Sequence, residues 1–134
     1  IGRGGMGEVY SAKKRDDNSP AAVKLLRLDF FGEKTAVARF EREAVIAASI
    51  SSPHVVRVLS VSGVDAVLPY IAMELLSGTD LGTYLRERGR LPLDEVCDMV
   101  RQVAAGLEAA HERSVVHRDL KPSNVFRTPW TVSE

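Results

Sequence analysis

The chain has 134 residues, of which 45% are hydrophobic and 27% are charged, values that suit one globular domain. Its 18 basic and 18 acidic side chains balance, so charge gives no reason to expect nucleic acid as a partner. One cysteine excludes an intrachain disulfide. No apolar run reaches the roughly 20 residues that a membrane-spanning helix needs, so we expect no membrane segment in this chain.

The first half of the chain predicts strands around one helix. The run Asp16-Asp17-Asn18-Ser19-Pro20 is a strong turn signal, which predicts a hairpin of the strands on either side. Apolar residues recur at helical spacing over 34–49. The expected strands are 8–14, 21–28, 55–61 and 67–74.

The second half predicts helices and one polar loop. A short helix is expected over 81–88, where Gly89 stops it. A longer helix is expected over 93–113, with Pro92 before it. The polar loop 117–124 follows. Strands, a helix, more strands and then helices predict an α+β fold in two layers or lobes.

Residues 2–9 have the pattern G-x-G-x-x-G-x-V. Glycines let the backbone amides of a loop approach phosphate oxygens without side chains in the way. A dinucleotide-binding fold uses similar glycines, and Asp29 lies at the spacing where that fold places an acid. That fold also needs a helix directly after the glycines, and none fits between Gly7 and Asp29. A glycine-rich hairpin turn without a ligand is the remaining alternative.

Lys24 lies on an apolar strand, and two acids of the following helix compete to pair with it. Alternation along the strand does not decide whether Lys24 faces solvent or a site. Glu43 and Glu41 are about 200° apart around the helix, so both cannot face the sheet. Glu43 flanks the apolar stripe more closely, and we expect it to be the partner; a solvated charged face is the alternative.

The segment 117–124 has the sequence H-R-D-L-K-P-S-N. Transfer of a phosphoryl group needs a carboxylate for the attacking hydroxyl, a cation for the γ-phosphate and an oxygen ligand for Mg²⁺. Asp119, Lys121 and Asn124 are those chemical types within six residues. The spacing therefore predicts a phosphoryl-transfer loop.

The glycine pattern, the A-V-K strand, the helical glutamate and H-R-D-L-K-P-x-N together resemble the protein kinases, in that family's order. The detailed strings of residues 1–10 and 119–124 are most similar to bacterial serine/threonine kinases. This resemblance implies a small antiparallel sheet lobe with one packed helix, followed by the start of a mainly helical lobe. The implied boundaries are 1–73 for the sheet lobe, 74–78 for the hinge and 79–134 for the helical part.

The resemblance also implies roles for single residues. Lys24, paired with Glu43, would hold the α- and β-phosphates of ATP, Asp119 would be the catalytic base, and Lys121 would steady the γ-phosphate. Asn124 would bind Mg²⁺. The residues that would surround ATP are Ile1, Gly2, Gly4, Gly5, Gly7, Val9, Ala22, Lys24, Met73, Glu74 and Leu76.

The implied activity is transfer of the ATP γ-phosphate to serine or threonine hydroxyls of proteins, in the cytoplasm. The family's D-F-G aspartate and later segments do not occur in these residues, so we expect this fragment alone to be inactive. We also expect the apolar stripe of the 93–113 helix to be exposed, because these residues do not include the rest of the helical lobe that would cover it. Residues 127–134 have no clear counterpart in the family. A kinase-like ATP-binding or scaffold module without catalysis is the alternative function.

Overall fold

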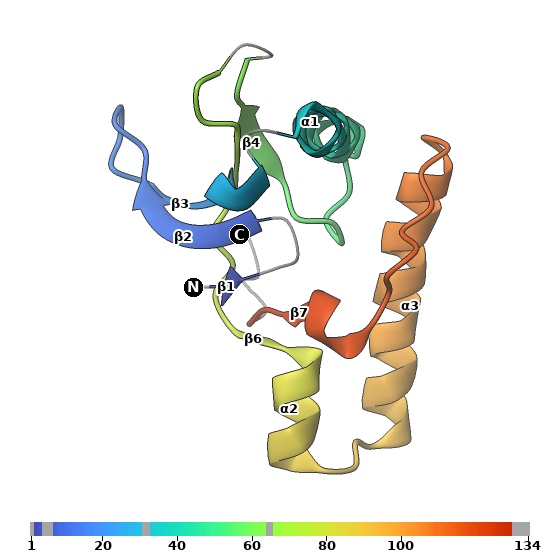
Figure 1. Cartoon of the computed structure of the whole chain (residues 1–134). Coiled ribbons are helices and arrows are strands. Elements are labelled where there is room, and N and C mark those ends of the chain that lie inside the picture. The colour runs from blue at the N-terminus through green and yellow to red at the C-terminus, as the bar shows by residue number, and fades with distance from the viewer. Residues whose placement is uncertain (1, 4–6, 31–32, 64–65, 130–134) are drawn as a thin grey trace. The chain divides into compact units, whose positions relative to one another are not determined.

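The structure, a computed structural model, describes residues 2–3, 7–30, 33–63 and 66–129 (Figure 1). Side chains are described in these ranges except at residues 2, 3 and 28. The chain divides into two compact units. The first comprises residues 1–51 and 55–75, and the second comprises 52–54 and 76–134.

The first unit contains an antiparallel sheet with the strand order β1-β2-β3-β5-β4. The strands are β1 (Gly2–Arg3), β2 (Gly7–Lys13), β3 (Pro20–Leu26), β4 (Val58–Val61) and β5 (Tyr70–Glu74). The expected hairpin is confirmed, since β2 and β3 pair over their full length. In its turn, the Lys14 amide donates to the Ser19 carbonyl at 2.9 Å, and Asn18 adopts a positive φ of 56°.

The last two strands of this sheet are shorter than the sequence predicts. β5 begins at Tyr70 because Pro69 has no amide hydrogen and cannot donate to the ladder. β4 begins only at Val58, after a loop that contains Pro53, and its pairing with β5 shifts register between Val58 and Ser60.

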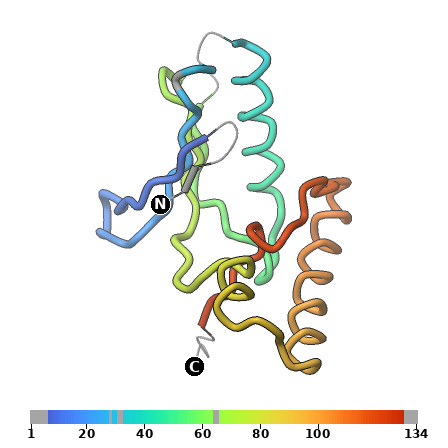
Figure 2. Tube along the Cα trace, turned by 60° about the horizontal axis from the view of Figure 1, so that its bottom comes forward, coloured from blue at the N-terminus to red at the C-terminus, as the bar shows by residue number. Residues whose placement is uncertain are grey.

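Helix α1 (Lys34–Ser49) packs on this sheet (Figure 2). Its bounds match the prediction. A short 3₁₀ helix, η1 (Leu28–Phe30), precedes it, which the sequence analysis did not foresee. The core between helix and sheet consists of Leu26, Phe40, Ala44 and Ile71. Phe40, only 1% exposed, is the largest fully buried side chain of the described residues.

The second unit contains α2 (Leu81–Arg88), α3 (Leu93–His111), the 3₁₀ helix η2 (Pro122–Asn124) and a two-stranded sheet of β6 (Thr79–Asp80) and β7 (Phe126–Arg127). The α2 prediction is confirmed, and α3 ends two residues earlier than expected. The α+β fold class is confirmed, with an antiparallel sheet and one helix followed by further helices.

The exposed apolar side chains of α3 lie in its first half. Leu93, Val96 and Val100 are 78%, 38% and 60% exposed, whereas Gly106 and Ala110 near the other end are buried. The expected uncovered stripe is therefore present over the first two turns. No helix in the described part of the chain is long and apolar enough to cross a membrane.

Candidate functional site

One face of the first sheet carries the side chains that the sequence analysis assigned to ATP. In the antiparallel register, Lys24 lies opposite Val9 and Ile71, and Ala22 lies opposite Met73. Directly paired residues, and residues two apart on one strand, share a face of a sheet. Val9, Ala22, Lys24 and Met73 therefore share the face on which the core residue Ile71 packs against α1.

Lys24 contacts an aromatic ring of α1, and among the described residues it forms no ion pair with a carboxylate. Its Nζ lies 5.7 Å from the centroid of the Phe40 ring, a cation–π contact. Glu43 is exposed, and no ion pair joins it to Lys24 within the described residues. Glu41 is half-buried, and its Oε1 is buried with no hydrogen-bond partner among the described residues. The structure does not bring Lys24 and Glu43 together, and their pairing stays a prediction.

The last glycine of the glycine segment packs tightly against β3. A Cβ added at Gly7 would lie 2.9 Å from the Leu25 carbonyl oxygen and 2.9 Å from Cε of Lys24. The absence of a side chain thus lets the backbone lie beside the lysine stem. The backbone of Gly2 pairs with Val9. Ile1, Gly4 and Gly5, also assigned to ATP, lie outside the described residues.

The expected hinge begins at the end of β5, where Glu74 is tied to a neighbouring backbone. Oε1 of Glu74 accepts a hydrogen bond from the Arg57 amide at 2.7 Å. The Glu74 amide donates to the Arg57 carbonyl at 3.0 Å. Met73 packs against the core of the first unit, and Leu76, in the second unit, is half-buried. Contact of Met73, Glu74 and Leu76 with a nucleotide stays a prediction.

The loop 117–124 brings Asp119, Lys121 and Asn124 together. Nζ of Lys121 lies 2.9 Å from Oδ2 of Asp119. Nδ2 of Asn124 donates to the Asp119 carbonyl oxygen at 2.8 Å and to Oδ2 at 3.2 Å. Lys121 and Asn124 thus converge on the Asp119 carboxylate within six positions, as the spacing predicts.

Backbone bonds within the loop set this geometry. The Asp119 amide donates to the His117 carbonyl at 2.8 Å, across Arg118, whose φ is +60°. The amides of Asn124 and Val125 donate back to Lys121 and Pro122, closing η2. The loop therefore turns twice, and the second turn directs the Asn124 side chain back to Asp119.

The Asn124 amide suits a Mg²⁺ ligand. Both of its bonds to Asp119 use the amide nitrogen, so the amide oxygen remains available as a hard acceptor. The Asp119 side chain is 66% exposed, so a cation can approach its carboxylate. The donor chemistry of these two side chains fits Mg²⁺.

Comparisons with known proteins show the family of this chain. The family model "Protein kinase domain" matches residues 1–129. The chain belongs to the protein kinase family. It is 40% identical over 128 residues to a probable serine/threonine-protein kinase of Clostridium perfringens, covering 96% of this chain and 18% of that protein. It is 42% identical over 128 residues to the serine/threonine-protein kinase PknF of Mycobacterium tuberculosis, covering 94% of this chain and 27% of PknF.

A solved structure shows the same fold. The crystal structure of the Mycobacterium tuberculosis PknI kinase domain superposes with a TM-score of 0.78 at 33% identity, covering 96% of this chain. The resemblance to bacterial serine/threonine kinases is thereby confirmed. The kinase chain described here spans 53% of that PknI chain and about a fifth to a quarter of the curated relatives above.

The groups of the 117–124 loop also change the pKa of the Asp119 carboxyl group. The hydrogen bond and charge of Lys121, with a further hydrogen bond from Asn124, lower the pKa of Asp119 from its ordinary value of 3.8. Asp119 is therefore a carboxylate at every pH near neutrality. Its bonds contribute to stability above the ordinary pKa and are lost as the pH falls through the lowered pKa.

Replacing Lys121 with methionine should raise the pKa of Asp119 toward 3.8, because the strongest stabiliser of its ionised form is gone. A pH titration of carboxyl ¹³C shifts by NMR measures this change. Asp17 is the internal control, since hydrogen bonds from Ser19 lower its pKa and Lys121 plays no part there. An unchanged Asp119 titration in the Lys121→Met variant would contradict the contact as described.

The residue that caps α2, the helix bonded to the end of the 117–124 loop, was not predicted from the sequence. Asp80 caps α2, with Oδ1 accepting from the Thr83 amide at 3.0 Å and Oδ2 from the Thr83 hydroxyl at 2.7 Å. These bonds lower the pKa of Asp80. An aspartate directly before an expected helix, with threonine three residues on, is a capping signal that could have identified it. The pairing of β6 with β7 left no comparable signal in two-residue strands.

Proposed function

We propose that the protein to which this chain belongs is an ATP-dependent protein serine/threonine kinase. The observation that carries the proposal is the convergence of Lys121 and Asn124 on the Asp119 carboxylate. In this role Asp119 accepts the proton of a serine or threonine hydroxyl as that oxygen attacks the γ-phosphorus of ATP. Lys121 neutralises charge on the transferred phosphoryl group.

The nucleotide is assigned to the face of the first sheet that carries Val9, Ala22, Lys24 and Met73. Val9 and Ala22 supply apolar surface for adenine, with the backbone of 74–76 as its hydrogen-bonding edge. Lys24 exchanges its contact with Phe40 for the α- and β-phosphates, where Glu43 would orient it. Mg²⁺, held by Asn124, supplies positive charge to the phosphates when bound.

We propose that the kinase activity needs more of the kinase domain than these 134 residues. The chain spans 53% of the related PknI kinase-domain chain, so we expect the 134 residues by themselves to transfer little phosphate. The proposed division is a sheet lobe at 1–73, a hinge at 74–78 and a helical part at 79–134. The Lys121-Pro122 pair resembles that of serine/threonine kinases, which supports serine and threonine as acceptors. We assign the reaction to the cytoplasm.

The full-length protein, with Mg²⁺ and γ-labelled ATP, should transfer label to serine or threonine of a generic acceptor such as casein. Lys24→Met should weaken ATP binding roughly ten- to a hundredfold, because charged hydrogen bonds contribute about 1.5 to 3 kcal/mol. Equilibrium binding of a fluorescent ATP analogue measures the affinity. Lys13→Met is the matched control, since Lys13 is exposed at the end of the neighbouring strand.

Two results would count against the proposal. Label on tyrosine alone would contradict the acceptor class. Tight ATP binding by the full-length wild-type protein, without transfer to any acceptor, would support the binding or scaffold module instead.

A further inference from the structure

Three side chains connect β7, the strand after the 117–124 loop, with helices α2 and α3 of the second unit. On β7, Nη2 of Arg127 lies 3.2 Å from Oε1 of Glu95 on α3. The Arg127 guanidinium carbon lies 4.3 Å from the centroid of the Tyr84 ring on α2. The Tyr84 hydroxyl donates to the same Oε1 of Glu95 at 2.9 Å. We call Arg127, Tyr84 and Glu95 the strand anchor.

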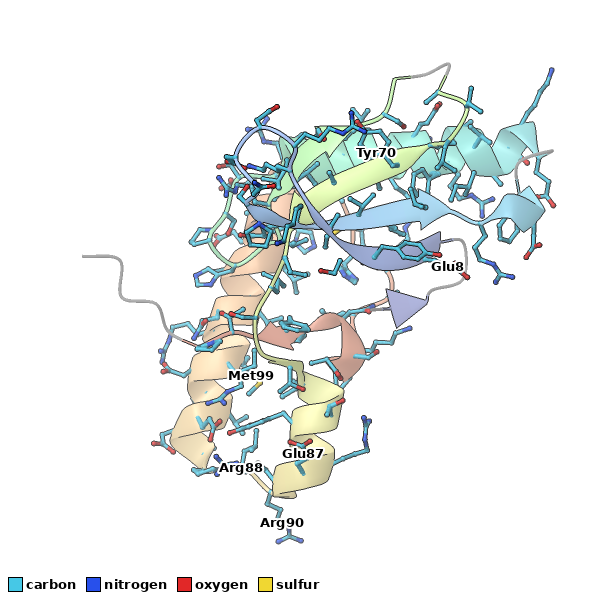
Figure 3. All side chains as sticks on the ribbon, turned by 90° about the vertical axis from the view of Figure 1, so that its left-hand side faces the viewer. Glu8, Tyr70, Glu87, Arg88, Arg90 and Met99 are labelled. Atoms are coloured by element: carbon cyan, nitrogen blue, oxygen red, sulfur yellow. The ribbon has the colours of Figure 1, made fainter. Side chains whose placement is uncertain are left out.

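The buried Tyr84 ring distinguishes the strand anchor from an ordinary surface ion pair. Tyr84 is 7% exposed, and the side chains of Glu95 and Arg127 are 28% and 48% exposed. Exposed ion pairs contribute little to stability. Here a planar guanidinium stacks on a buried ring and pairs with a carboxylate that also accepts a hydrogen bond. Arg88, labelled on α2 in Figure 3, approaches the same ring at 5.5 Å.

Arg127, the member of the strand anchor on β7, lies three residues after Asn124, the end of the 117–124 loop. Between them, the Val125 carbonyl accepts a hydrogen bond from the Leu81 amide at 2.8 Å, at the start of α2. Phe126 then pairs with Asp80, and Arg127 pairs with Thr79. The loop end is therefore attached to α2 through backbone bonds, and Arg127 adds side-chain bonds to α2 and α3.

We propose that Arg127 is a positioning residue for the kinase reaction. Through Tyr84 and Glu95 it holds the end of the 117–124 loop, and so fixes where the oxygens of Asp119 and Asn124 meet the metal and the acceptor hydroxyl. This role rests on the proposed function, whereas the effect of Arg127 on loop order does not.

Hydrogen exchange of the full-length protein tests the effect on loop order. In Arg127→Met, the amides of Asn124 and Val125 should exchange about tenfold faster, because a charged pair and a cation–π contact are lost. Glu95→Gln should give a smaller increase. Arg101→Met is the matched control, since the ion pair that Arg101 makes among the described residues is with exposed Asp98 on α3, and exchange in the loop should not change.

Kinetics of the same variants test the effect on the reaction. Arg127→Met should raise the Mg²⁺ concentration for half-maximal rate several-fold, and saturating Mg²⁺ should restore part of kcat. Arg127→Lys keeps the charge but loses the planar stack, so it should lie between wild type and Arg127→Met. A general loss of stability would lower kcat at every Mg²⁺ concentration and would not shift this midpoint.

Unchanged exchange of the loop in Arg127→Met overturns the proposal, whatever the activity. The proposal is also overturned if, in the Arg127→Met and Glu95→Gln variants, amides throughout α2 and α3 exchange faster by the same factor as those of the loop. That result would indicate general destabilisation. A wild-type protein that transfers no phosphate refutes the proposed kinase function, and the exchange comparison still decides whether Arg127 orders the loop.

Discussion

Asp119→Asn should lower kcat of the full-length protein by about 10² to 10⁴, the usual contribution of a positioned general base. The amide has nearly the shape of the carboxylate but cannot accept the hydroxyl proton at neutral pH. It also loses the charge that holds Lys121 at 2.9 Å. ATP affinity should change little, because the proposed nucleotide contacts come mainly from strands β2, β3 and β5 and not from Asp119. Initial rates over a range of ATP concentrations separate kcat from KM.

The control for this result is Asp98→Asn. Asp98 is also an exposed, ion-paired aspartate, but its partner is Arg101 on α3. Its rate should equal that of wild type. The pH dependence of the wild-type kcat gives a second check. Because the pKa of Asp119 is lowered from 3.8, protonation of Asp119 should not reduce kcat until the pH falls below that value. Asp119→Asn retaining more than a tenth of the wild-type kcat would exclude Asp119 as the base.

Helix positions followed from the sequence because their signals are local. The bounds of α1 and α2 agree with apolar spacing and with Gly89, whose φ of +74° ends α2. The Asp119 loop was also predictable, because all three of its side chains come from one short segment. Such a segment closes on itself through turns that its own residues specify.

Contacts between distant segments were harder to predict. Helical rotation alone put Glu43 nearer the inward stripe, yet in the structure Glu43 is exposed and Glu41 is half-buried. Both lie at the margins of that stripe, where a small rotation of α1 decides between them. The strand anchor brings Tyr84, Glu95 and Arg127 together from three elements, and no spacing in the sequence connects them.

Gly78→Ala should destabilise the second unit more than Gly89→Ala does. Gly78 has a φ of +124°, and a Cβ there would overlap the carbonyl oxygen of Arg127. A strained backbone costs about 1 to 3 kcal/mol, and forced repacking costs a further 1 to 3 kcal/mol or so. We therefore expect the free energy of unfolding to fall by about 2 to 6 kcal/mol. Urea denaturation followed by far-UV circular dichroism measures the loss.

Two other glycines separate the causes of that loss. Gly89→Ala meets strain without a clash, since φ is +74° and no atom lies within 4 Å of the added Cβ, so about 1 to 2 kcal/mol should be lost. Gly63→Ala meets neither and should stay within about 0.5 kcal/mol of wild type. If Gly78→Ala costs no more than Gly89→Ala, then β7 does not press against residue 78.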